Sequence, residues 1–171
     1  MQAQSQAEKI LRELDYDFAS FDLDDFLRFV GRRNGCEIVP IPWEGMPLGI
    51  FGMWLRDRQE PLIYILYRCN VPLMHQVHIQ LHEVAHFLLG HFAPDISQDL
   101  VYAIINGKVL PPFDKMTLLR ADKKTPQDID AETLTNLIQQ KVVQQAGLSR
   151  LTVNLSTEER LANFLRGMRL E

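Results

Sequence analysis

The segment HEVAHFLLGH, residues 82–91, is the most informative part of the chain. Its first eight residues belong to a stretch from Leu73 to Leu89 in which apolar residues recur at helical spacing. Four histidines follow one another along this stretch at steps of three and four: His75, His78, His82 and His86. Residues four apart share one face of an α-helix, about 6 Å apart along its axis. The stretch therefore predicts an amphipathic helix with histidines gathered on one side.

Within this helix the residues His82, Glu83 and His86 form the pattern H-E-x-x-H. Two imidazoles four residues apart can bind one Zn²⁺ ion at about 2.0–2.1 Å each. Glu83 lies beside the metal position, where it can take a proton from an attacking water and pass it to a leaving amine. The pattern predicts His82 and His86 as metal ligands and Glu83 as the catalytic residue.

A third protein ligand has to come from elsewhere, and a downstream acidic segment is the best source. On a helix over this segment, Asp128 and Glu132 share one face, whereas Asp130 points away from it. We favour Asp128 as the third ligand and keep Glu132 as the alternative. Asp128 is also the third residue of a helix that begins after Thr125, so its alternative role is to cap that helix.

Gly90 and His91 close the histidine-rich segment. They lie four and five residues after His86, which does not match the metzincin pattern H-E-x-x-H-x-x-G-x-x-H. Gly90 is a typical residue to end a helix. We therefore expect His91 to cap the helix or to face solvent rather than to bind metal.

The rest of the chain predicts helices at both ends and a small sheet before the histidine helix. Helices are expected at Gln2–Leu14, Phe21–Val30, Pro126–Ala146 and from Thr157 to about Arg169. Strands are expected at Glu37–Ile41, Ile50–Leu55 and Leu62–Tyr67, while Leu100–Ile105 fits either type of element. This order predicts an α+β fold. We expect a single domain over residues 1–171, with its core at about 21–146 and a C-terminal helical extension at 147–171.

Composition limits the classes of function. The 171 residues are 46% apolar and 23% charged, which is typical of globular proteins. The net charge of -4 argues against direct nucleic-acid binding, which needs clustered basic residues. Cys36 and Cys69 form no C-x-x-C pair, so a disulfide framework or a cysteine-rich zinc module is not expected. The polar N-terminus and short apolar runs predict a cytoplasmic protein that does not enter a membrane.

Three segments together resemble the ImmA/IrrE family of metallopeptidases. They are LIYILYRCN at 62–70, HEVAHFLLGH at 82–91 and DIDAETLT at 128–135. The resemblance covers about Phe21 to Gln145. It implies a minimal zincin-like fold, in which the active-site helix packs on a small mixed sheet with flanking helices. It also implies that Asp128 stands where the family has its third zinc ligand, a glutamate. His78 departs from the family, which usually has an apolar or aromatic residue there, and we expect it to pack beside the site.

The leading hypothesis is a zinc-dependent endopeptidase that cleaves a specific protein. Family members typically cleave helix-turn-helix repressors or antitoxins, so the resemblance implies such a partner. We expect the substrate to lie as an extended strand along Ile50–Leu55, which would satisfy its backbone groups. The alternative is a non-catalytic, zinc-containing binding or regulatory protein of a mobile element. Glu83 favours the first hypothesis, because a structural zinc site does not need it.

Overall fold

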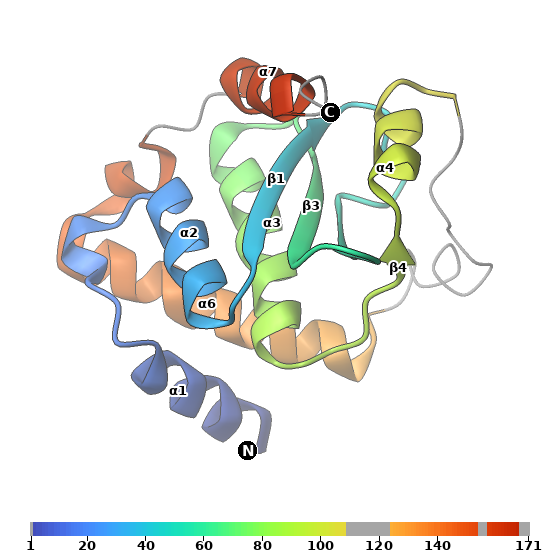
Figure 1. Ribbon diagram of the computed structural model, residues 1–171. Helices are drawn as coiled ribbons and strands as arrows, with labels where there is room; N and C mark the ends of the chain where they lie inside the picture. The colour runs from blue at the N-terminus through green and yellow to red at the C-terminus, as the bar shows by residue number, and fades with distance from the viewer. Residues whose placement is uncertain (1, 109–123, 154–156, 168–171) are drawn as a thin grey trace.

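The computed structural model describes residues 2–108, 124–153 and 157–167 (Figure 1). Within these ranges it contains six α-helices and one four-stranded sheet, which confirms the predicted α+β class. The helices are α1 (Gln2–Leu14), α2 (Leu23–Arg33), α3 (Leu73–Leu88), α4 (Gln98–Ile105), α6 (Pro126–Ala146) and α7 (Thr157–Gly167). The strands are β1 (Glu37–Trp43), β2 (Gly52–Asp57), β3 (Leu62–Arg68) and β4 (Asp95–Ile96). Two short 3₁₀ helices lie at Phe18–Ser20 and Leu148–Thr152.

The sheet is mixed, and its strands lie in the order β1-β3-β2-β4. β1 runs parallel to β3, β2 runs antiparallel to β3, and β4 runs parallel to the end of β2. β3 is therefore an inner strand, as its nearly continuous apolar sequence predicts. Its side chains alternate between the two faces. Ile63 and Ile65 join one hydrophobic core, and Tyr64 and Leu66 join the other.

The helices cover both faces of the sheet. The first core contains residues of α1, α2, α3 and α6, and the second contains residues of α4 and α7. Ala7 of α1 and Phe164 of α7 are buried in these cores, so side chains outside residues 21–146 also contribute to them. No helix of the described residues is both long and apolar enough to cross a membrane.

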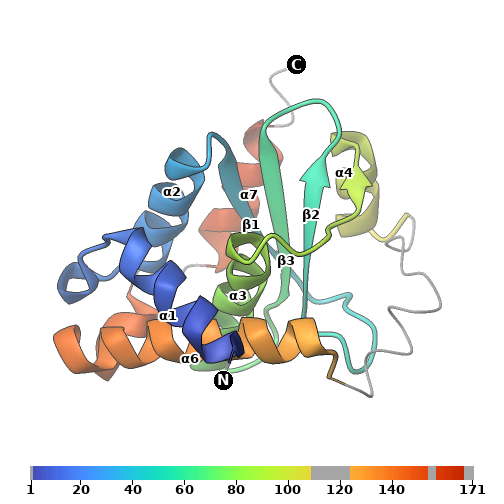
Figure 2. The same cartoon turned by 90° about the horizontal axis from the view of Figure 1, so that it is seen from below.

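The histidine helix α3 lies between the sheet and α6 (Figure 2). One face of α3 is apolar and packs on the sheet through Val77, Leu81 and Val84, which are fully buried. The other face turns its histidines toward the first turns of α6, because His82 and His86 approach carboxylates of that helix. The packing of these two helices therefore places the predicted ligand residues side by side.

Several predicted boundaries match the structure, and the differences have local causes. α1 and α6 have the predicted bounds, and Leu100–Ile105 lies in a helix. α2 continues past Gly31 to Arg33, because the N–H of Asn34 still reaches the carbonyls of Val30 and Gly31. The predicted end of the last helix, near Arg169, falls outside the described residues.

Candidate metal centre

His82, His86 and Asp128 lie together, as predicted. The Nε2 atoms of the two histidines are 3.1 Å apart, and Asp128 Oδ1 lies 3.5 Å from His86 Nε2. One possible ligand atom from each residue lies within 4.8 Å of the other two. Ligands of a tetrahedral zinc ion with bonds of about 2.0–2.2 Å are separated by about 3.4 Å, so the spacing fits such an ion. The three residues form the His82–His86–Asp128 group.

Asp128 also caps α6, so the two roles considered for it are compatible. Its Oδ2 accepts hydrogen bonds from the backbone N–H of Thr125 at 2.7 Å and from the Thr125 hydroxyl at 2.6 Å. The Asp128 N–H donates to Thr125 Oγ1 in return, which completes a capping box. The other oxygen, Oδ1, remains directed at His86. Capping through Oδ2 thus leaves Oδ1 free to face His86.

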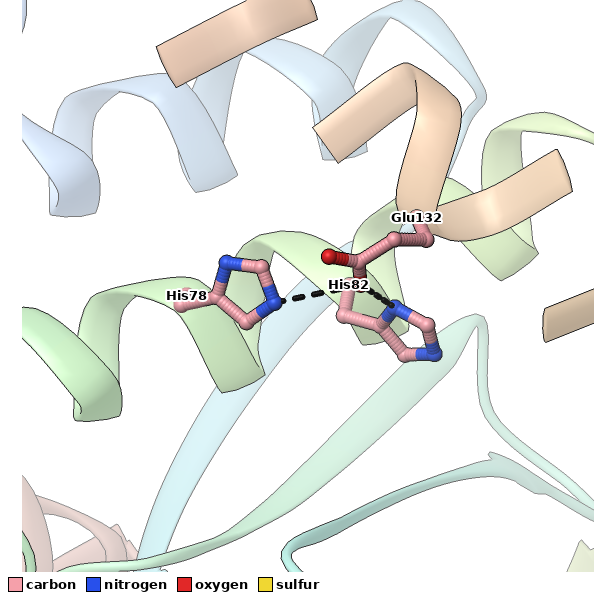
Figure 3. Close-up of side chains that lie close together, drawn as sticks. All are labelled: His78, His82 and Glu132. Atoms are coloured by element: carbon pink, nitrogen blue, oxygen red, sulfur yellow. Dashed lines mark hydrogen bonds and ion pairs between the residues drawn. The ribbon is translucent and has the colours of Figure 1, made fainter. Parts of the chain in front are cut away.

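Glu132, the alternative third ligand, lies on the other side of His82. Its Oε2 is 3.4 Å from His82 Nδ1 and 3.2 Å from His78 Nε2 (Figure 3). His78 in turn places Nδ1 3.1 Å from the side-chain oxygen of Gln139. His82 Nδ1 is buried and lacks a hydrogen-bond partner of good geometry among the described residues. These residues form a second cluster with spacing suited to a metal, the His78–His82–Glu132 group.

The two groups share His82 through its opposite ring nitrogens. A neutral imidazole has a lone pair on one nitrogen and a hydrogen on the other, so it can serve only one of the two groups as a ligand. A metal on His82 Nε2 leaves the hydrogen on Nδ1, which lies 3.4 Å from Glu132 Oε2. Metal-bound histidines commonly donate their second N–H to such a carboxylate. Glu132 therefore fits best as the residue that orients His82.

The electrostatics of the His82–His86–Asp128 group favour neutral imidazoles and an ionised carboxylate. Burial lowers the pKa of His82 although the Glu132 and Asp128 carboxylates oppose it. Burial, with the positive charges of His82 and His91, lowers the pKa of His86 to about 4. Burial raises the pKa of Asp128, but hydrogen bonds from Thr125 and the nearby imidazoles outweigh it and lower that pKa overall. Zinc requires ligands in these protonation states, so the donor set fits the ion.

Glu83 lies beside this group and is itself buried, with 8% of its surface exposed. Burial, followed by the negative charge of Asp128, raises the pKa of Glu83 to about 8, although the Trp54 backbone N–H donates to the carboxylate and opposes the rise. A carboxyl group with a pKa near neutrality can both accept and release a proton. The structure thus places the predicted catalytic residue next to the predicted ligands.

The contacts of Glu83 identify two residues of β2 that sequence reasoning did not assign. One is Trp54, the donor to the Glu83 carboxylate. The other is Gly52, where a Cβ would lie 2.7 Å from Glu83 Oε1 and 2.6 Å from Ile79 Cγ2. A glycine inside a strand is a sign of close approach by another element, so the sequence carried a signal for Gly52. Trp54 acts through its backbone, which no residue pattern reveals.

β2, which contains most of the expected edge stretch Ile50–Leu55, is covered by another strand over part of its length. β4 pairs with Arg56 and Asp57 at the end of β2, so β2 is not an edge strand over its whole length. Among the described residues, no strand pairs with the outer side of Gly52–Leu55. The backbone of Arg56 faces β4, because its N–H donates to Pro94. Trp54, two residues earlier, faces the same side.

His91 and Asp130 lie outside both metal groups. His91 was expected to cap the helix or to face solvent, and its backbone N–H does cap α3 by donating to the His86 carbonyl. Its side chain does not face solvent: it is half-buried, and its Nδ1 lies 2.8 Å from His86 Nδ1.

No protein-family model matches the chain, and no curated protein or solved structure is significantly similar to it.

Proposed function

We propose that this protein is a zinc-dependent endopeptidase with a minimal zincin-like fold. One observation carries the proposal. The Nε2 atoms of His82 and His86 converge with Asp128 Oδ1, while Glu83 of the same helix is held beside them by the Trp54 backbone. A structural metal site needs the three ligands but not a buried carboxyl group with a raised pKa next to them.

The three ligand residues and Glu83 have different roles in the proposed hydrolysis of a peptide bond. His82, His86 and Asp128 would hold the cation, which would supply Lewis-acid chemistry toward the scissile carbonyl and the attacking water. Glu83 takes the proton of that water, and its carboxylate form is favoured once positive charge lies on the neighbouring ligands. Because the Glu83 side chain is buried, it then holds this proton away from solvent until the proton passes to the leaving amine.

The open side of Gly52–Leu55 supplies a place for an extended substrate. A peptide strand added beside β2 would use backbone hydrogen bonds for affinity and side-chain contacts for specificity. Such a strand would pass Glu83, because the Trp54 N–H on this side already contacts that carboxylate. A protein substrate, with helix-turn-helix repressors and antitoxins as the first candidates, agrees with this mode and with the sequence resemblance.

The experiment combines metal analysis with cleavage assays on purified full-length protein. We expect about one zinc per chain, lost in His82→Ala and in His86→Ala, and cleavage of at least one protein from a panel of repressors and antitoxins. Glu83→Gln should keep the zinc but slow cleavage by at least about 100-fold, because glutamine cannot accept the proton.

Glu13→Gln is the matched control, since Glu13 lies exposed on α1, where it pairs with the exposed Lys9. It should cleave at the wild-type rate. A wild-type protein without zinc, or full activity in Glu83→Gln, would contradict the proposed function.

A further inference from the structure

His91 completes the segment HEVAHFLLGH but belongs to neither metal group. Its ring lies against that of His86, with centroids 5.0 Å apart and ring planes at 63°. The closest atoms are the two Nδ1 nitrogens, at 2.8 Å. This is a hydrogen-bond distance, so one of the two nitrogens carries the hydrogen and the other accepts it.

The turn after α3 brings His91 into this position. The N–H of His91 donates to the His86 carbonyl at 3.0 Å, and the N–H of Gly90 donates to the Phe87 carbonyl at 3.0 Å. Gly90 has φ +71°, a left-handed conformation. These features define a Schellman motif, which folds the chain back over the last turn of a helix. The residue after the glycine therefore returns to the level of His86.

The direction of the hydrogen bond follows from the geometry of the metal group. His86 Nε2 faces His82 Nε2 and Asp128 Oδ1, so this is the nitrogen that would bind a cation. A neutral His86 that binds through Nε2 carries its hydrogen on Nδ1. That hydrogen points at His91 Nδ1, which accepts it, and His91 keeps its own hydrogen on Nε2.

We propose that His91 is a positioning residue, which fixes the tautomer and the ring orientation of His86 so that Nε2 is presented to the cation. The proposal rests on the metal site of the proposed function. It gives both ligand histidines a partner on the outer nitrogen, since Glu132 faces His82 Nδ1 in the corresponding place. Partners of this kind change metal affinity or activity by about 10- to 100-fold when they are removed.

The test compares substitutions that keep or remove the acceptor. In His91→Asn the amide oxygen can take the place of Nδ1, whereas His91→Leu leaves the His86 Nδ1–H without an acceptor. We expect zinc affinity, measured by competition with a chromophoric chelator, to fall about 10- to 100-fold in His91→Leu and only a few-fold in His91→Asn. The absorption spectrum of the Co²⁺ form should change in His91→Leu and stay close to wild type in His91→Asn.

His75→Leu is the matched control, because His75 lies on the same helix but packs against Phe51, with tilted rings, outside both metal groups. It should bind zinc as tightly as the wild type. A second pair tests the turn: Gly90→Ala places an unfavourable side chain at positive φ, whereas Gly90→Asn tolerates this conformation. We expect Gly90→Ala to weaken zinc binding and Gly90→Asn to retain it, and this pair decides the matter if His91→Leu does not fold.

The outcomes separate this proposal from the proposed function. If the wild type binds zinc and cleaves its substrate while His91→Leu and Gly90→Ala bind zinc equally well, only the role of His91 is wrong. Equal loss in His91→Leu and His91→Asn would also overturn it, since the acceptor would then be irrelevant. A wild type that binds no zinc would overturn both proposals.

Discussion

Asp128 uses its two carboxylate oxygens for different tasks: Oδ2 caps α6 through Thr125, and Oδ1 faces His86. Asparagine at this position keeps an oxygen for the capping bonds but is a poor zinc ligand. We expect Asp128→Asn to lower zinc affinity by at least about 10-fold, and to lower the free energy of unfolding by no more than about 1 kcal/mol. Chelator competition and urea denaturation measure the two effects separately.

Two further variants make this prediction specific. Thr125→Ala removes the cap at a cost of about 1 kcal/mol but keeps the carboxylate, so it should weaken zinc binding less than Asp128→Asn. Glu132→Gln keeps an acceptor for His82 Nδ1–H and should also have the smaller effect on zinc. A larger loss of zinc in Glu132→Gln than in Asp128→Asn would place the metal in the His78–His82–Glu132 group instead.

The turn between β2 and β3 is organised by one buried carboxylate. Asp57 accepts hydrogen bonds from the backbone N–H groups of Gln59 at 2.8 Å and Glu60 at 2.9 Å, and from the Tyr64 hydroxyl at 2.7 Å. Burial raises the pKa of Asp57, but these donors outweigh it and bring the pKa below its ordinary value of 3.8. Folding therefore favours the ionised form of this side chain.

A carboxyl group whose pKa is lowered by folding stabilises the folded protein at pH values above the pKa that the group has in the unfolded chain. This stabilisation is lost as the pH falls through the pKa that the group has in the folded protein. We expect Asp57→Asn to lower the free energy of unfolding at pH 7 by about 1–3 kcal/mol. As the pH falls below about 4, the free energy of unfolding should also decrease less in the variant than in the wild type. Urea denaturation across this range measures both effects, and Glu44→Gln, at an exposed position, should behave as wild type. An unchanged acid dependence in Asp57→Asn would refute this account.

At the scale of elements, most of the fold could be predicted because the signals are local. Thr125, Pro126 and Gly147 define both ends of α6. The N-cap Asp22 places the start of α2 at Leu23, two residues after the predicted start at Phe21. β1 runs on to Trp43 through Pro42, because an edge strand does not need every N–H for pairing. β4 has only two residues and follows Pro94, so its sequence carries no strand pattern.

The sequence could predict which residues form the candidate site, but not which of their atoms face one another. Helical spacing selected His82, His86 and the pair Asp128 and Glu132 without showing which nitrogen faces which carboxylate. That choice depends on how α3 and α6 pack, which is a tertiary property. The position of His91 depends on a left-handed turn at one residue. Gly90 indicated such a turn, because glycine often ends a helix. Only the structure shows that this turn places the His91 ring against His86.

At the scale of the whole molecule, Arg160 of α7 connects three parts of the fold. Its guanidinium donates to the Tyr67 hydroxyl at 3.2 Å, to the Gln80 side chain at 2.7 Å and to the Asp24 carboxylate. These partners belong to β3, α3 and α2, respectively. Only 8% of the Arg160 surface is exposed. These contacts therefore connect α7 to β3, α3 and α2.

Removing Arg160 should leave several buried polar groups without their partner. We expect Arg160→Ala to lower the free energy of unfolding by about 2–4 kcal/mol, since unpaired buried polar groups are costly. Arg166→Ala is the control on the same helix: Arg166 is exposed and donates to Ala162 and Asn163 of α7, so its loss should cost less than about 0.5 kcal/mol. Urea denaturation of both variants is the measurement, and equal stabilities would contradict this role for Arg160.

Gly52 has a practical consequence for engineering this protein. A Cβ at this position would collide with both the side chain that carries out proton transfer in the proposed mechanism and the helix that presents it. Anyone who diversifies β2 to redirect substrate choice should therefore hold position 52 constant and randomise its neighbours. In this sheet, the Glu83 and Ile79 side chains already fill the space that a side chain at position 52 would need, so even one added methyl group would displace them.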